Sequence, residues 1–202
     1  MHPDTMRLID RWVGIPLCFF ASFWPLKKAQ ADSNSTLATN IPPPDTIVFI
    51  LIAEIGALVV AYPAIKETRK QHPKSRICFI TAPAGLQTLE LMGFEKEDIF
   101  LLETTSIKSL LKGIVNIRSH FKGKRVSAIV LEPFTRFSTL LSAWIGASKR
   151  IGCYRFLNEG VYLGNILTHR LVYNPHLHMS QTYFALAKAL IEPDSAKPLL
   201  KE

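Results

Sequence analysis

Cysteine is scarce in this 202-residue sequence, and its few positions argue against two classes of small protein. The three cysteines, Cys18, Cys78 and Cys153, are far apart and odd in number. They form no CxxC pair and no Cys/His cluster, so neither a zinc site nor a disulfide framework is indicated. Cys78 and Cys153 fall within expected strands, where a free thiol behaves as a small buried hydrophobe. A reducing compartment is therefore favoured.

Glycine-rich phosphate fingerprints are also missing. The sequence has neither the GxGxxG pattern of dinucleotide-binding turns nor the GxxxxGK[ST] pattern of P-loop enzymes. An enzyme that depends on NAD or a flavin is therefore a weak interpretation, and no internal repeat suggests a solenoid.

Aspartate is the third scarcity, and it narrows the choice of a catalytic carboxylate. Four of the six aspartates precede the expected domain core, one begins a strand at the end opposite to the usual ligand site, and one lies in the tail. In chain order they are Asp4, Asp10, Asp32, Asp45, Asp98 and Asp194. None is placed as a general base, so a carboxylate that does chemistry in this domain must be a glutamate.

What the sequence has in excess is positive charge. Lysine and arginine number 24 against 16 acidic residues, which gives a net charge of +8 and a pI near 9.5. This balance predicts an anionic partner: a phosphate, an acidic lipid surface or a nucleic acid. The basic residues of 122–125 lie near Lys108, Lys112 and Arg118, but no aromatic platform or recognition helix accompanies them. A solvated face or contact with an anionic membrane therefore fits better than nucleic-acid binding.

An uncharged apolar stretch, "WVGIPLCFFASFWPL" at 12–26, precedes the domain and is followed by two lysines. It is shorter than the roughly 20 residues that span a bilayer. We expect residues 1–28 to form an anchor in the membrane interface. The alternatives are a secretory signal, disfavoured by the lysines, and a hairpin packed on its own domain. Residues 29–45, rich in proline and small polar residues, predict a linker.

From residue 46 the pattern alternates between apolar runs and helical periods. Strands are expected at 47–53, 76–81, 99–102, 126–131 and 150–154, and helices at 58–71, 83–92, 106–121, after 135 and at 180–191. The helix at 106–121 is expected to bury one stripe: Ile107, Leu110, Leu111, Ile114 and Phe121. The stretch between 155 and 175 is interpreted as loops. This alternation predicts a Rossmann-like, doubly wound parallel sheet over 46–191, followed by a tail or interdomain linker at 192–202.

Ligands of such sheets bind beyond the carboxyl ends of the strands. Glu54 follows the first strand, Glu132 follows the fourth, and Arg155 and Glu159 follow the fifth. Glu54 is a candidate base, with a solvated carboxylate near a helix start as the alternative. Gly56, two residues later, would let the backbone approach a ligand, although packing of the helix on the strand explains a lone glycine equally well.

The turn after the fourth strand carries a further cluster of polar residues. Arg136, near Thr135 and Ser138, suits a phosphate or carboxylate better than it suits the positive end of a helix dipole. A surface ion pair is the alternative. His176 and His178 have no accompanying carboxylate motif, so hydrogen bonding or proton transfer is favoured over metal binding.

Three blocks of the sequence together resemble a known family, glycosyltransferase family 9, which contains the bacterial lipopolysaccharide heptosyltransferases. They are "GALVVAYPAIK", "FTRFSTLLSAWIGASKRIGCYRF" and "EGVYLGNILTHRLVYNPHLHMSQ". The likeness covers roughly residues 46–191. It implies a GT-B architecture, in which two Rossmann-like domains face each other, with this chain as the N-terminal, acceptor-side half.

The resemblance also implies a function: metal-independent transfer of a sugar from a nucleotide donor to a glycolipid, at the cytoplasmic face of the bacterial inner membrane. The absence of an Asp-x-Asp motif agrees with this. The donor would be a substrate, no cofactor is expected, and most of the donor site would lie in a C-terminal domain that is missing or separate. The chain alone is therefore expected to be inactive.

One departure from the family affects the chemistry. Heptosyltransferases place an aspartate, thought to be the base, directly after the turn glycine, whereas this sequence has Ala57. Glu54 or Glu132 would then replace the base. The remaining candidates for acceptor binding are Gly56, Ala57, Thr135, Arg136, Ser138, Arg155, Glu159, His176 and His178. The alternative is a degenerate, non-catalytic membrane-surface module that keeps only the fold.

Overall fold

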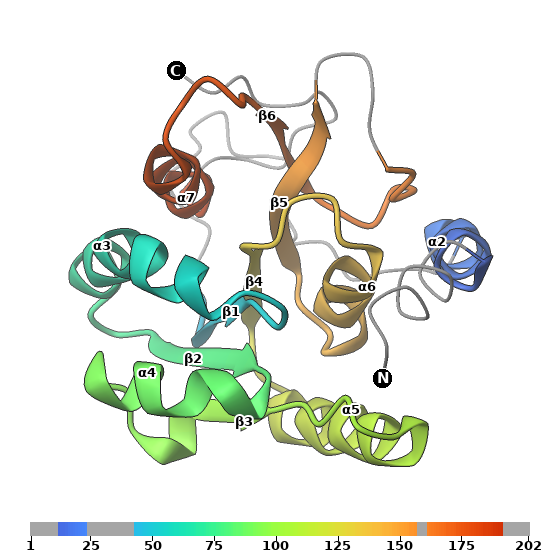
Figure 1. Cartoon of the computed structure of the whole chain (residues 1–202), viewed down its shortest axis with the longest axis horizontal. Coiled ribbons are helices and arrows are strands. Elements are labelled where there is room, and N and C mark those ends of the chain that lie inside the picture. Colours follow the sequence, from blue (N-terminus) through green and yellow to red (C-terminus); the bar gives the residue numbers. More distant parts are fainter. Residues whose placement is uncertain (1–11, 24–42, 157–160, 192–202) are drawn as a thin grey trace, which may run out of the picture.

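The computed structural model of the chain describes residues 12–23, 43–156 and 161–191, apart from the side chains of residues 155 and 156. Within them, six strands form one sheet in the order β3-β2-β1-β4-β5-β6, and every neighbouring pair is parallel. Figure 1 shows this sheet with helices on both of its faces. The predicted Rossmann-like, doubly wound architecture is confirmed.

The centre of the sheet is its most apolar part. β1 (Thr46–Ile50) and β4 (Val126–Val130) are buried at every position, and β1 pairs with β4 on one side and with β2 (Arg76–Thr81) on the other. Runs of β-branched and aromatic residues fit a strand that is covered on both faces. The edge strands are β3 (Ile99–Leu101) and β6 (His169–Tyr173), and β5 (Lys149–Phe156) lies between β4 and β6.

The helices divide between the two faces of the sheet, each over its own hydrophobic core. The first core contains buried side chains of α3 (Ile55–Gln71), α4 (Leu86–Leu91) and α7 (Met179–Lys188). The second contains those of α5 (Ile107–Phe121) and α6 (Arg136–Trp144). Short 3-10 turns, η1 (Pro83–Gly85) and η2 (Lys96–Asp98), precede α4 and β3.

Two details of the sequence-based expectation are wrong. β6 was expected to be loop, because His169 and Arg170 interrupt the apolar pattern. The side chain of His169 is nevertheless buried and lies at hydrogen-bonding distance from Thr168, with 2.9 Å between Nδ1 and Oγ1. The stripe of α5 also differs from the expectation: Ile117 and Phe121 are buried, whereas Ile107 and Leu111 are 64% and 57% exposed. The first turns of α5 therefore present apolar side chains outward.

The apolar N-terminal stretch contains a helix, α2 (Gly14–Phe23), that packs on α6. Figure 1 places α2 at the side of the domain, beside α6. Within the described residues, no helix is long and apolar enough to cross a membrane. The predicted linker at 29–45 and the tail at 192–202 lie largely or wholly outside the described residues.

Candidate functional site

Glu132 joins the two central strands at their carboxyl edge. Its Oε1 accepts hydrogen bonds from the backbone N–H groups of Ile52 and Ala53, at 2.7 and 2.6 Å, just beyond β1. Its Oε2 accepts a hydrogen bond from the hydroxyl of Ser138 in α6. The side chain is buried, so these donors replace the water that an ionised carboxylate would otherwise bind. Glu132 therefore holds the end of β1 and the start of α6 together through hydrogen bonds.

Glu54 has a different environment. It is exposed, occupies the N-cap position of α3, and its side chain makes no capping hydrogen bond. Its backbone carbonyl accepts a hydrogen bond from the N–H of Ala57 at 3.2 Å. An exposed carboxylate at the positive end of a helix can accept a proton from an approaching substrate, whereas both oxygens of Glu132 are already engaged.

A buried tyrosine, Tyr183, interacts electrostatically with both glutamates, and no sequence pattern pointed to it. Burial raises the pKa of the Tyr183 phenol to about 12, with further contributions from Glu54, Cys153, Glu132 and Tyr173. Tyr183 belongs to α7, which packs against α3. The phenol therefore keeps its proton at neutral pH, and the charges of both carboxylates favour this protonated form.

The Gly56 turn is open on its outer side. Gly56 is exposed, and a Cβ added to it would meet no atom within 4 Å. The glycine is therefore not required by packing within the described residues, which is compatible with a ligand approaching the backbone. The side chain of Ala57 is partly buried against the core of the α3 face.

Phe134, in the turn after Glu132, adopts a φ of +61°. This left-handed conformation is costly for a bulky residue and is concentrated at functional sites. The ring of Phe134 packs edge-on against Tyr173, with 5.5 Å between ring centroids. The contact connects the turn after β4 with the end of β6. It could not be predicted from the sequence, because β6 lacks the apolar run of a typical strand.

The cluster predicted around Arg136 is divided by the structure. Arg136 is the first residue of α6, and its Nε donates a hydrogen bond to the carbonyl of Tyr162 at 3.2 Å. Ser138 is fully buried against Glu132, so it positions the Glu132 carboxylate. Thr135 precedes α6 without capping it through its side chain. Arg136 therefore joins the start of α6 to the segment after β5.

The two predicted histidines lie at the start of α7. His178 is the N-cap residue, and its Nδ1 accepts a hydrogen bond from the backbone N–H of Ser180 at 3.2 Å. His176 is exposed, with its backbone N–H bonded to Asn174. Among the described residues, no three His, Cys, Asp or Glu side chains gather as a metal site would require. The side chain of Arg155 and all of Glu159 lie outside the described residues.

Similar architectures occur among solved structures. A family 9 glycosyltransferase from Veillonella parvula matches 73% of this chain with a TM-score of 0.56 and 19% identity. The E. coli heptosyltransferase WaaC matches 75%, with TM-scores of 0.55 in its ADP form and 0.57 in its form with ADP-2-deoxy-2-fluoro heptose, at 8% and 10% identity. This chain shares its Rossmann-like fold with the matched parts of these glycosyltransferases.

The match covers only part of those proteins. This chain spans 41% of the Veillonella chain and about half of the WaaC chains. No protein-family model matches the sequence, and no curated protein matches it either. At these identities the likeness concerns the fold alone.

Proposed function

We propose that this chain is the acceptor-side half of a metal-independent glycosyltransferase, which moves a sugar from a nucleotide-sugar donor to a lipopolysaccharide-type glycolipid. The observation that carries the proposal is the fold shared with WaaC over three quarters of the chain. The enzyme would work as a peripheral protein at the cytoplasmic face of the bacterial inner membrane. The main donor site would lie in a second Rossmann-like half, in frame or on a separate chain.

Within this proposal, Glu54 is the general base. Of Glu54 and Glu132, it is the exposed one, and its side chain makes no capping hydrogen bond. It also lies three residues before the position at which heptosyltransferases have their aspartate. It would take the proton from the acceptor hydroxyl as that oxygen attacks the anomeric carbon and the nucleotide leaves. Glu132 is a positioning residue that holds the Ile52–Ala53 backbone in place.

The remaining candidates would hold the acceptor. Gly56 and Ala57 would shape the surface beside the base, and the N–H groups at the start of α3 would face an anionic group. The acceptor's other anionic groups would be held by Arg136 and Arg155, with Thr135, Glu159, His176 and His178 as further polar contacts. Ser138 would contribute through Glu132.

Binding measurements test whether this chain binds the acceptor and lacks the main donor site. In titration calorimetry, the 202-residue chain is expected to bind a truncated lipopolysaccharide acceptor and to bind ADP-2-deoxy-2-fluoro heptose no more tightly than millimolar. Micromolar binding of the nucleotide sugar by this chain would overturn the acceptor-side assignment. Transfer activity is expected only after a donor-binding half is supplied, and it should survive EDTA.

A second candidate is a non-catalytic module that keeps the fold without the chemistry. Ala57, at the position of the family's base, favours it. The two candidates separate when a donor-binding half is present: sustained transfer that depends on Glu54 supports the enzyme, whereas acceptor binding without any turnover supports the module.

A further inference from the structure

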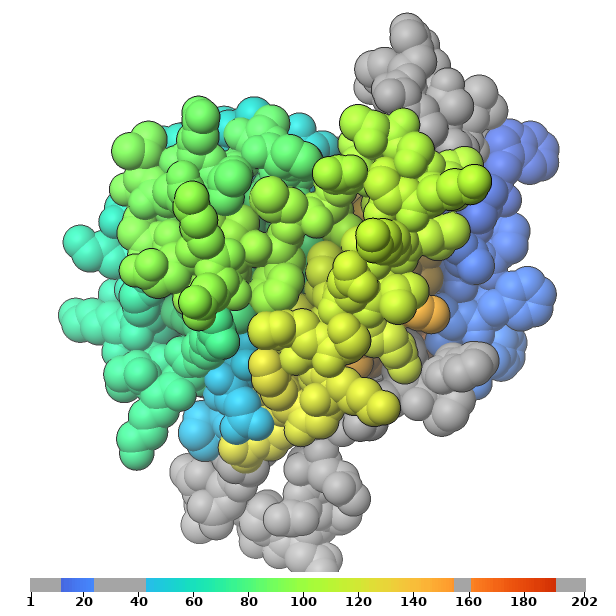
Figure 2. Space-filling view, turned by 90° about the horizontal axis from the view of Figure 1, so that it is seen from below, coloured from blue at the N-terminus to red at the C-terminus, as the bar shows by residue number. Residues whose placement is uncertain are grey.

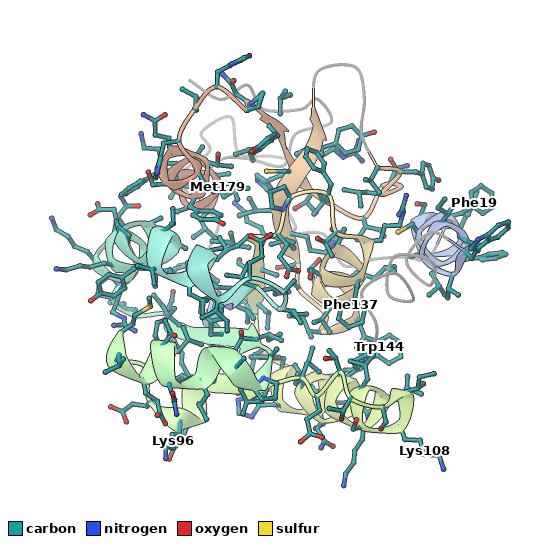
Figure 3. All side chains as sticks on the ribbon, in the orientation of Figure 1. Phe19, Lys96, Lys108, Phe137, Trp144 and Met179 are labelled. Atoms are coloured by element: carbon teal, nitrogen blue, oxygen red, sulfur yellow. The ribbon has the colours of Figure 1, made fainter. Side chains whose placement is uncertain are left out.

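α2 presents an almost wholly apolar surface to its surroundings. Seven large hydrophobic side chains in or next to it are exposed, among them Trp12 at 73% and Phe23 at 74%. In full they are Trp12, Val13, Ile15, Leu17, Phe19, Phe20 and Phe23. Figure 3 shows Phe19 on the side of α2 that points away from the domain. A contiguous apolar patch of this kind usually marks a site of interaction.

The inner side of α2 explains why the helix presents this face outward. Gly14 and Cys18 are its buried residues, and Ser22 continues the same stripe one turn later. The hydroxyl of Ser22 donates to the carbonyl of Cys18 at 2.7 Å and accepts a hydrogen bond from the N–H of Asn165 at 3.0 Å. Small residues spaced by four thus let α2 lie close to the domain, while the large side chains face away.

Acidic residues are also unevenly distributed over the helices. α2, α5 and α6 contain no aspartate or glutamate, and none occurs between Glu103 and Glu132. The exposed cations of α5 are Lys108, Lys112 and Arg118. Among the helices on the two faces of the sheet, the acidic residues are Glu67 in α3 and Glu90 in α4, both on the opposite face. The face formed by α2, α5 and α6 is therefore complementary to a negatively charged surface.

α5 adds apolar side chains among these cations. Ile107, Leu111 and Val115 are all more than half exposed and follow one another at intervals of four residues. The guanidinium of Arg118 stacks over Trp144 of α6, at 4.7 Å from the ring centroid. Figures 1 and 2 both place α2 and α5 on the same side of the molecule, and Figure 1 shows α6 beside them. Figure 3 shows Lys108, in the first turn of α5, pointing outward from the domain.

We propose that this face docks on an anionic lipid membrane, with the outward side chains of α2 in the acyl boundary and the cations of α5 on the headgroups. The α2 helix has 10 residues and a length of about 15 Å, which suits the interface and is too short to cross it. Exposed tryptophan and phenylalanine beside lysines are typical of interfacial helices. The inference rests on the peripheral location proposed above and supplies the surface for it.

Docking on this face would also orient the acceptor side. The Asn165 N–H that contacts α2 lies three residues after Tyr162, whose carbonyl accepts the hydrogen bond of Arg136. The segment that holds Arg136 is therefore attached to the proposed membrane helix. A glycolipid acceptor would reach the carboxyl edge of the sheet from the same lipid surface.

Vesicle flotation without donor or acceptor tests the surface apart from sugar transfer. The full chain is expected to float with phosphatidylethanolamine–phosphatidylglycerol vesicles and much less with phosphatidylcholine vesicles. The double substitution Phe20→Ser/Phe23→Ser should weaken binding at least about tenfold, because two exposed aromatic rings leave the acyl boundary. The matched control is Leu91→Ser in α4, which removes a 90% exposed apolar side chain from the other face and should bind as the native chain does.

The charges are tested in the same assay. Lys108→Glu/Lys112→Glu should lower binding to the anionic vesicles by about tenfold or more and leave binding to phosphatidylcholine vesicles unchanged. The control Lys66→Glu/Lys70→Glu changes the same charge on α3 and should have a much smaller effect. Circular dichroism should show native helix content for every variant, since all these side chains are exposed.

Three outcomes would overturn the proposal. The first is native binding by Phe20→Ser/Phe23→Ser, and the second is an equal loss in Leu91→Ser. The third is a dimer in vesicle-free sedimentation that becomes a monomer in Phe20→Ser/Phe23→Ser, because a second copy of the chain would then be the occupant of this face. Absence of sugar transfer would leave the vesicle result, and hence this inference, unaffected.

Discussion

The carboxylate of Glu132 holds the backbone N–H of Ala53 at 2.6 Å, although the two residues are 79 positions apart in the sequence. This contact, with the one to Ile52, fixes the segment that leads from β1 into α3. Because Glu54 follows Ala53 directly, the position of the proposed base depends on a carboxylate from another strand.

Removal of the Glu132 carboxylate should therefore cost stability. Glu132→Ala leaves two backbone N–H groups and the Ser138 hydroxyl without their acceptor, so the free energy of unfolding should fall by about 2–4 kcal/mol. Glu132→Gln retains one acceptor oxygen and should cost less, about 1–2 kcal/mol. Urea unfolding followed by circular dichroism measures both. Glu54→Gln, an exposed matched variant, should stay within about 0.5 kcal/mol of the native chain; a larger effect there would contradict the different roles proposed for Glu132 and Glu54.

Glu54→Gln should instead affect turnover. With a donor-binding half present, kcat is expected to fall by at least about 100-fold, because the amide cannot accept the proton of the attacking hydroxyl. The measurement is sugar transfer to native acceptor, with acceptor affinity determined in parallel. An unchanged rate would eliminate Glu54 as the base, and a loss confined to acceptor affinity would make it a binding residue.

Gly164→Ala should release α2 from the domain. A Cβ at this position would lie 2.0 Å from the Oγ of Ser22 and 2.7 Å from the carbonyl oxygen of Cys18. The buried Cys18 thiol should then react faster with a thiol reagent under native conditions. Gly123→Ala is the control, since its φ of +82° is at least as unfavourable for alanine as the +59° of Gly164, while its Cβ would meet nothing within 4 Å. Equal Cys18 labelling in both variants would show that backbone strain, and not the clash with α2, is responsible.

Stability should decline at alkaline pH because of two buried acidic groups. Burial, assisted by Asp98, raises the pKa of the Cys78 thiol from 9.0 to about 12, and burial raises that of Tyr183 from 10.0 to about 12. Above pH 9 the unfolded chain loses these protons while the folded chain retains them, so the free energy of unfolding falls as pH rises toward 12.

Urea unfolding between pH 8 and 11 measures this decline. Cys78→Ala should make its onset near pH 9 shallower, and Tyr183→Phe should reduce the slope above pH 10. Alkaline slopes that match the native slope in both variants would mean that neither group titrates differently in the folded and unfolded states.

Part of the fold could be predicted because its signals are local. The apolar runs of β1 to β5 and the periodicity of α3 each lie within a single segment, so these five strands and the parallel architecture could be predicted from them. The burial of Cys78 and Cys153 followed in the same way. β6 was missed because His169 is buried through a hydrogen-bonding partner, which no period of hydrophobicity encodes.

The candidate site depended more on tertiary structure. From the sequence alone, Glu54 and Glu132 are equivalent glutamates at the ends of strands. Only the folded chain brings the N–H groups of Ile52 and Ala53 and the hydroxyl of Ser138 to Glu132. Glu54, by contrast, is exposed. Tyr183 and the strained Phe134 were likewise invisible, because their neighbours belong to other elements.

The sequence by itself determined the composition of each segment: an acid-free, aromatic N-terminal stretch, a basic α5 and a parallel α/β domain. The tertiary structure decided which side of each helix packs on the domain and which side is exposed, because hydrogen bonds and close packing join residues far apart in the chain. The side of α2 that packs on the domain carries the small residues Gly14, Cys18 and Ser22, so its aromatic side chains face away from the domain.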